Sequence, residues 1–181
     1  KKQGVCRYKD YELEIIDLPG TYSLTAYSAE EIVTRNFIIE EKPDVVVCVV
    51  DASNLERNLY LAVQLMELNS PLMLAFNMSD LAKQKGLVFD IEKLSLLLNI
   101  KIVQTVGNKN EGINELLDTV IKTADEPLKN LAGLIKYGKE IEGEIDKLQQ
   151  KFSELQNNRW LVIKLLEQDA AVLKDIKIGR A

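Results

Sequence analysis

The sequence predicts an α/β fold in which a largely parallel sheet carries helices on both faces and is followed by a small all-α domain. Strands rich in β-branched residues alternate with amphipathic helical segments over the first two thirds of the chain. The segment 44–51 has an apolar run between its two terminal aspartates and shows no alternation, as expected of a strand that is covered on both faces. After Glu126-Pro127 the residues are almost all helix formers. We therefore expect one domain over residues 1–126 and a second over residues 127–181.

The expected elements follow from hydrophobic periodicity and turn residues. Strands at 4–8 and 12–16 are joined by a turn at Lys9-Asp10, and a helix follows at 29–41. The first domain then continues with strand 44–51, helix 55–68, strand 71–76, helix 91–98, strand 101–105 and helix 112–123. In the second domain, apolar residues recur at helical spacing at Leu131, Leu134, Ile135, Ile141, Ile145 and Leu148.

Composition and charge exclude several classes of protein. A chain of 181 residues that is 46% hydrophobic can bury a core. It contains no apolar run approaching the roughly 20 residues of a membrane span and opens on no signal peptide, so we expect a soluble piece. The net charge is −6 over residues 1–125 and +1 over residues 126–181, which predicts no nucleic-acid partner. Two cysteines and no histidine give no zinc cluster and indicate a reduced, cytosolic setting.

Ligands of such sheets bind at the carboxyl ends of the strands, so polar residues there are candidate site residues. The strand at 12–16 is followed by Asp17-Leu18-Pro19-Gly20. Asp17 can hold a metal-bound water, and the amide of Gly20 can face a terminal phosphate. The same residues also favour a βα turn for backbone reasons alone. This motif therefore leaves two interpretations open.

Two further strands end in residues suited to a guanine base. Asn77-Met78-Ser79-Asp80 follows the strand at 71–76. The Asp80 carboxylate can accept from the N1 and N2 donors of guanine, a pair that adenine does not present, although this motif could also be a helix N-cap. Thr105-Val106-Gly107 can offer a backbone N–H to the guanine O6. Asp51 also ends a strand, but we interpret it as the cap of the next helix.

The order and spacing of these motifs resemble the switch, base and base-supporting motifs of Ras-like P-loop GTPases. Longer stretches are similar to the cytoplasmic G domain and helical domain of FeoB, the prokaryotic ferrous iron transport protein. They read DLPGTYSLTAYSAEE (17–31), VVDASNLERNLYLAVQL (49–65), NMSDLAKQKG (77–86) and RWLVIKLLEQD (159–169). The resemblance covers essentially the whole chain.

The resemblance implies a slow GTPase that regulates a ferrous iron transporter at the cytoplasmic face of the cell membrane. GTP, GDP and Mg²⁺ would be its ligands, with Mg²⁺ held by Asp17 through water. Movement of residues 20–29 and of the following helix would act on the transporter's own membrane domain, and the second domain would resemble a dissociation inhibitor. A homo-oligomer is left open. The implied nucleotide-binding residues are Asp17, Leu18, Pro19, Gly20, Asn77, Met78, Asp80, Thr105, Val106 and Gly107.

Two departures from the pattern qualify what the chain can do. No GxxxxGK[ST] motif is present, so we expect the phosphate loop and the first switch to lie upstream of Lys1, and the 181 residues alone to be inactive. Thr21 stands where Ras-like enzymes carry the Gln that orients water, so this candidate catalytic residue predicts slow hydrolysis. Val106-Gly107 replaces the more usual Ser-Ala, but the backbone donor is retained.

Alternative functions are a related GTPase of ribosome assembly or tRNA modification, and a non-catalytic interaction fragment. The first would be expected to carry a basic appendage, which residues 126–181 do not form. The second would describe a chain that lacks its phosphate loop. Arg159-Trp160 is expected to anchor the second domain on the first, with the guanidinium pairing locally. With no histidine and no clustered thiols, we do not expect this portion to carry iron itself.

Overall fold

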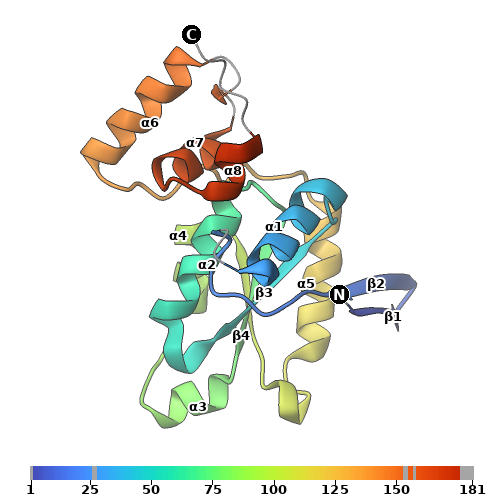
Figure 1. Cartoon of the computed structure of the whole chain (residues 1–181). Coiled ribbons are helices and arrows are strands. Elements are labelled where there is room, and N and C mark those ends of the chain that lie inside the picture. The colour runs from blue at the N-terminus through green and yellow to red at the C-terminus, as the bar shows by residue number, and fades with distance from the viewer. Residues whose placement is uncertain (1, 26–27, 153–154, 157, 176–181) are drawn as a thin grey trace.

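The computed structural model describes residues 2–25, 28–152, 155–156 and 158–175. Residues up to 125 form the α/β part, and three further helices gather at one end of it (Figure 1). In the described part of the chain, no helix is long and apolar enough to cross a membrane.

The chain begins with the predicted hairpin. Strand β1 (Lys2–Tyr8) pairs antiparallel with β2 (Tyr11–Asp17), from Lys2 opposite Asp17 to Tyr8 opposite Tyr11. Figure 1 shows this hairpin projecting from the side of the fold. Its tip is held by helix α5 (Ile113–Asp125), because Tyr8 Oη donates to the carbonyl of Asn114 at 3.3 Å and Lys9 pairs with Asp118.

A separate parallel sheet forms the centre of the α/β part. Its strands β3 (Val46–Asp51), β4 (Leu72–Asn77) and β5 (Lys101–Gln104) lie in the order β3-β4-β5. Around it lie α1 (Ala29–Glu41), α2 (Leu55–Glu67), α4 (Ile91–Leu98) and α5, each close to its expected bounds. The short helices α3 (Ser79–Gln84), η1 (Ala52–Asn54) and η2 (Gly107–Lys109) are additions that the sequence did not predict.

The two faces of the parallel sheet are covered to different extents. On one face, Cys48, Val50 and Phe76 are buried in a core that also takes in apolar residues of α1, α2 and α4. On the other face, Ala75 and Val103 are each 2% exposed, but Val49 of β3 is 62% exposed. Helix α5 contacts β4 and β5 on the sheet. The end of the sheet at β3 is therefore open on this face.

The sheet itself is divided, which the sequence did not predict. Among the described residues, β2 pairs only with β1, and the second edge of β3 has no strand beside it. The expected continuous sheet is therefore present as a hairpin and a three-stranded sheet.

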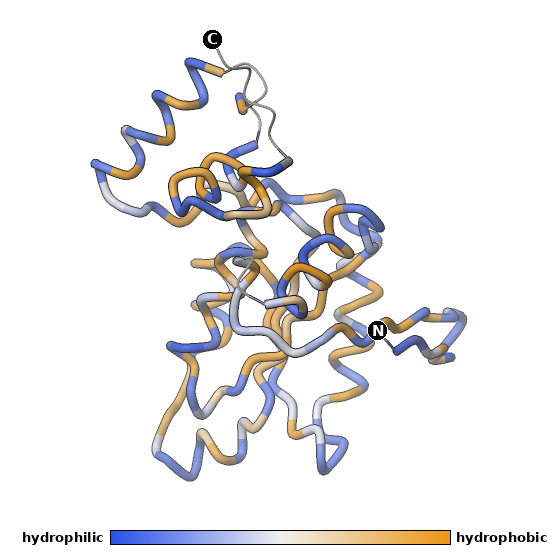
Figure 2. Tube along the Cα trace, viewed as in Figure 1, coloured by the Kyte–Doolittle hydropathy of each residue, from blue (hydrophilic) through white to orange (hydrophobic). Residues whose placement is uncertain are grey.

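The second domain contains α6 (Lys139–Lys151), α7 (Arg159–Leu166) and α8 (Ala170–Asp175). Ile145, Leu155 and Val162 form its small core. Figure 2 shows hydrophilic residues striped along α6, whereas α7 is hydrophobic over most of its length. A helix that is apolar on several sides needs more than one packing partner. Helix α7 meets this need by packing against both α6 and α2.

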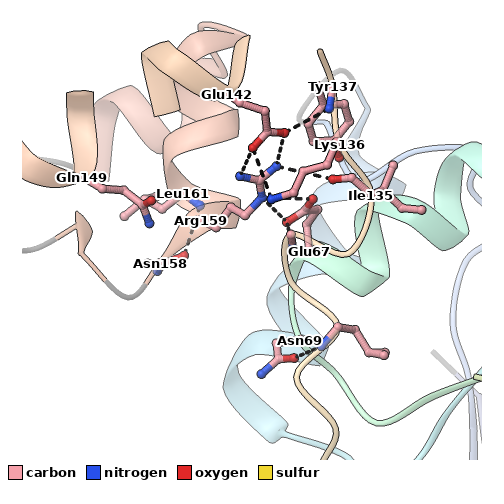
Figure 3. Close-up of polar contacts among 12 residues, drawn as sticks. Glu67, Asn69, Ile135, Lys136, Tyr137, Glu142, Gln149, Asn158, Arg159 and Leu161 are labelled. Atoms are coloured by element: carbon pink, nitrogen blue, oxygen red, sulfur yellow. Dashed lines mark hydrogen bonds and ion pairs between the residues drawn. The ribbon is translucent and has the colours of Figure 1, made fainter. Parts of the chain in front are cut away.

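Arg159 joins the two domains at the start of α7 (Figure 3). Its Nε lies 3.1 Å from Glu67 Oε2 at the end of α2, and its Nη2 lies 2.8 Å from Glu142 Oε1 on α6. Glu142 also accepts from the backbone N–H of Tyr137 at 3.0 Å, and Glu67 accepts from that of Gly133 at 3.2 Å. The predicted anchoring role of Arg159 is thereby confirmed, but its partners are distant in sequence rather than local.

A second contact joins α1 to the start of α8. Arg35 Nη1 lies 3.1 Å from Asp169 Oδ2, and both side chains are almost fully buried. The Arg35 guanidinium carbon also lies 5.7 Å from the centroid of the Trp160 ring. Trp160 therefore packs at the boundary between the domains, as the sequence predicted.

Candidate nucleotide site

The carboxyl ends of β4 and β5 bring together two of the predicted motifs. The parallel register places Phe76 beside Gln104, so the residues after each strand are neighbours. Asn77 Oδ1 accepts from the backbone N–H of Gly107 at 2.9 Å and from Thr105 Oγ1 at 3.4 Å. The Asn77 side chain thus fixes the loop that follows β5.

Ser79 also binds the loop that follows β5. Its hydroxyl donates to the carbonyl of Thr105 at 2.7 Å, and its backbone N–H donates to that oxygen at 3.3 Å. The N-cap of α3 is Met78, which has a left-handed backbone with φ of 57° and makes no side-chain cap bond. The alternative interpretation of Asn77 and Ser79 as side-chain caps of α3 is therefore wrong. Both side chains bind the neighbouring loop instead.

The loop after β5 has little freedom. Val106 and Glu111 pair across it through backbone hydrogen bonds of 3.1 and 3.3 Å, which close the turn that contains η2. Gly112 has φ of +77°, and a Cβ there would lie 2.2 Å from the carbonyl oxygen of Gln104. Only glycine fits this position. The backbone of Thr105, Val106 and Gly107 is accordingly held in place at both ends.

Asp80, the predicted guanine-reading residue, lies in the first turn of α3 and pairs with Lys109 of η2. Its Oδ2 is 2.6 Å from Lys109 Nζ, and its Oδ1 accepts from the backbone N–H of Leu81 at 2.9 Å. The hydrogen bond from Lys109 holds the pKa of the Asp80 carboxyl below its usual value, and the same bond raises the pKa of Lys109. Sequence reasoning missed Lys109; a lysine two residues after Gly107 was the available signal.

The Asp17 motif lies apart from this group. Asp17 is the exposed last residue of β2, and Leu18 packs against the core of the parallel sheet. The carbonyl of Pro19 accepts from Thr34 Oγ1 of α1 at 3.3 Å, and space is open around Gly20. In the described part of the chain, no hydrogen bond or ion pair joins residues 17–21 to Asn77 or Asp80.

The hydroxyl of Thr21 is used within its own turn. It donates to the carbonyl of Ser23 and accepts from the Ser23 backbone N–H at 3.2 Å. Further along, the backbone N–H of Leu24 donates to Gln64 of α2, and Lys164 Nζ of α7 donates to Thr25 Oγ1 at 3.1 Å. Of the predicted switch segment 20–29, residues 26 and 27 lie outside the described residues.

The Asp17 motif offers a carboxylate suited to a hydrated metal. Asp17 is exposed at a strand end, and Mg²⁺ usually keeps several waters and binds through only one or two carboxylates. Asp17 fits such a role. Among the described residues, no group of three or more acidic, cysteine or histidine side chains forms a metal site.

A parallel sheet with polar loops at its strand ends, helices around it and a helical domain after it is the fold of P-loop GTPase-like proteins. The chain belongs to the FeoB family within that class. A family model described as Ferrous iron transport protein B matches residues 1–120. A second, described as FeoB cytosolic helical domain, matches residues 137–180.

Individual relatives agree with this assignment. A Porphyromonas gingivalis Fe(2+) transport protein A/Fe(2+) transporter FeoB fusion protein is 44% identical over 93% of this chain and 21% of its own length. The FeoB G domain of Methanococcus jannaschii is 47% identical with a TM-score of 0.68, covering 70% of this chain and 81% of that one. The cytosolic domain of Thermotoga maritima FeoB in its GMPPNP form is 33% identical with a TM-score of 0.86, covering 100% and 74%. The chain spans about one fifth of the length of the curated FeoB relatives that it matches.

Proposed function

We propose that this chain is the guanine-nucleotide-binding regulatory part of a ferrous iron transporter, and that it hydrolyses GTP slowly only together with a phosphate loop. The observation that carries this proposal is the hydrogen bond from the Gly107 N–H to Asn77 Oδ1. Asp80 follows directly after Ser79, whose hydroxyl donates to the carbonyl of Thr105 in the same loop. This bond sets a fixed backbone loop beside the carboxylate that would read the base. Family membership and the GMPPNP form of the T. maritima domain support guanine nucleotides as the ligands.

The base would lie against the Asn77, Met78 and Asp80 motif and the loop of Thr105, Val106 and Gly107. Asp80 would accept from guanine N1 and N2, and the loop backbone would donate to O6. The phosphates would extend toward residues 17–20, where the Gly20 N–H would donate to the γ-phosphate. Asp17 would hold Mg²⁺ through water, and the metal when bound would neutralise charge on the phosphates.

We further propose that a segment preceding Lys1 carries the phosphate loop and completes the sheet. Among the described residues, β2 and β3 each have one edge with no strand beside it, so one further strand could join them, and a helix after that strand could pack on exposed Val49. A strand, a glycine-rich loop and a helix are the parts that the missing motif requires. The G domain would then run through residue 126, and the helical domain from 127 to 181.

Coupling to the membrane domain would start at the segment after Gly20. Loss of the γ-phosphate would release this segment, and α1, which is bonded to Pro19 and paired with Asp169, would carry the change to the helical domain at the cytoplasmic face of the membrane. Slow hydrolysis would follow from Thr21, because its hydroxyl is engaged with Ser23 and is too short to orient water as Gln does.

The substitution Asp80→Asn tests the proposal in a protein that includes the upstream segment. The Asn amide presents a donor to guanine N2–H₂ and leaves one donor unpaired, a loss of about 1–3 kcal/mol. Xanthine has a carbonyl at that position, so the variant should bind XTP more tightly and GTP more weakly than wild type. Paired titrations of both nucleotides measure this. An equal loss of both nucleotides would show that Asp80 is structural, and unchanged binding would remove it from the site.

A further inference from the structure

We propose that Lys109 binds the Asp80 carboxylate while the base pocket is empty, and that an entering guanine must displace the lysine ammonium group. The inference rests on the proposed function, because it assumes that Asp80 reads guanine. It adds a residue that limits how quickly the base enters.

The geometry places the two groups in competition. Lys109 Nζ lies 2.6 Å from Asp80 Oδ2, the distance of a direct charge-assisted hydrogen bond. Guanine recognition needs both carboxylate oxygens, one for N1–H and one for N2–H₂. Oδ1 already accepts from the Leu81 N–H. Oδ2 accepts from Lys109 and would be available to the base if the lysine moved away. A base donor that approaches Oδ2 therefore meets an ammonium group already bound there.

Displacement needs only a side-chain movement. The Lys109 backbone is held by its N–H bond to the Val106 carbonyl at 2.9 Å, and the loop is fixed further by Asn77 and by the constraint at Gly112. The Lys109 side chain is 50% exposed, whereas that of Asp80 is 25% exposed. A lysine side chain is a flexible stem with a mobile charge. Lys109 can therefore swing into solvent while the loop that supports the base stays in place.

A second acidic residue also attracts Lys109. The charge of Glu111 also acts on Lys109 and adds to the raised pKa of its ammonium group. Among the described residues, Asp80 and Glu111 are the carboxylates that act on Lys109.

The expected effect is modest, because the pair is exposed. Exposed ion pairs are weak, so we expect a change of about 1.4- to 5-fold in an equilibrium or rate. The effect should appear in nucleotide association, since the pair exists in the empty site. It should shrink as salt screens the attraction between the two groups.

The test measures association and dissociation of a fluorescent GDP analogue in the full-length protein. Lys109→Met should raise the association rate about two- to fivefold at low salt and leave the dissociation rate nearly unchanged. The gain should disappear at about 0.5 M salt. Lys109→Arg keeps the charge and should behave like wild type. Lys83→Met is the matched control, because Lys83 lies on the same helix as Asp80 and is exposed, and in the described part of the chain it makes no ion pair.

A double substitution makes the test specific. Asp80→Asn removes the carboxylate that Lys109 binds, so adding Lys109→Met should not change association of the corresponding xanthine nucleotide further. An unchanged GDP association rate in Lys109→Met, or slower association, would overturn the inference while leaving the proposed function intact. The same gain in the Asp80→Asn background would also overturn it. If the wild-type protein binds no guanine nucleotide, the proposed function fails, and this inference fails with it.

Discussion

Arg159 shows how a single residue can connect three segments that lie far apart in the sequence. Its guanidinium binds Glu67 at the end of α2 and Glu142 on α6. The guanidinium carbon also lies 5.6 Å from the centroid of the Tyr137 ring. The planar guanidinium presents several donors at fixed angles, so it can serve two carboxylates at once. A lysine at this position would satisfy fewer of these acceptors.

The Glu142 carboxyl should make stability depend on pH in the acid range. Its hydrogen bonds from Arg159 lower its pKa from 4.5 to about 2. Because the folded pKa is depressed, the stabilisation is complete above about pH 5 and is lost as the pH falls toward 2. Glu142→Gln should lower the free energy of unfolding by about 1.5–3 kcal/mol at pH 7.

Denaturant unfolding of wild type and Glu142→Gln from pH 7 to pH 2.5 would measure this difference. The gap between the two should narrow as the pH decreases. Glu144→Gln serves as the control, because Glu144 lies on the same helix with an exposed side chain paired only to Lys147 among the described residues. A gap that stays constant across the range would contradict the assigned pKa.

At the residue scale, strand-end motifs were predictable and their partners were not. Asn77 and Thr105 could be identified because parallel strands place their carboxyl ends at one edge. Lys109 could not, because loop lysines are common and its contact with Asp80 depends on the shape of η2. The Glu67 partner of Arg159 lies 92 residues away in sequence, so no local pattern indicated it.

At the scale of elements, α7 is the helix on which the second domain depends. Its second residue, Trp160, is only 7% exposed, and Val162 joins the small core around Ile145. Lys164 of α7 also donates a hydrogen bond to the hydroxyl of Thr25 in the segment after β2. One face of α7 therefore packs within the second domain, and another contacts the first.

Trp160→Ala should destabilise the docked arrangement. Removing a buried tryptophan typically costs about 3–5 kcal/mol, because the cavity is only partly filled by relaxation. The melting temperature should fall by roughly 6 °C or more, measured by circular dichroism, while the ratio of GTP to XTP binding stays the same. Tyr60→Ala, at a half-exposed position on α2, is the control and should change stability little. A normal melting temperature with altered base preference would contradict the docking role.

The elements themselves were predicted better than their assembly. The hairpin at Lys9-Asp10, the cap formed by Asp51 on Ser53, and the helices of the first domain follow from local residue patterns. Helix α3 escaped prediction, because its six residues overlap the strand-end motif and are too few to show a period. The division of the sheet also escaped, since strand order depends on contacts between distant segments.

At the scale of the whole molecule, the chain carries the base half of the proposed site more completely than the phosphate half. Asn77 and Ser79 bind the loop at Thr105 through hydrogen bonds, and Asp80 pairs with Lys109 of η2 after that loop. For the phosphates, the proposed site draws on Asp17 and Gly20 among the described residues, and both are exposed. Phosphate binding in this class depends on a loop of backbone N–H donors and a lysine.

The 181-residue chain alone should therefore bind Mg-GTP weakly. Isothermal titration calorimetry should give a dissociation constant well above about 1 µM, and extension of the chain upstream through the phosphate loop should tighten binding at least about tenfold. Guanosine, which lacks phosphates, is the matched ligand control and should gain little from the extension. Submicromolar binding by the 181 residues would show that the phosphates are held elsewhere.

The open edge of β3 affects how this polypeptide should be produced and handled. Residues 46–51 are nearly all apolar, and in the part of the chain that the structure describes no strand pairs with their second edge, where Val49 is exposed. Such an edge is a template for strands of other chains and promotes aggregation. If the proposed upstream strand is expressed with the chain, it should cover this edge and reduce aggregation.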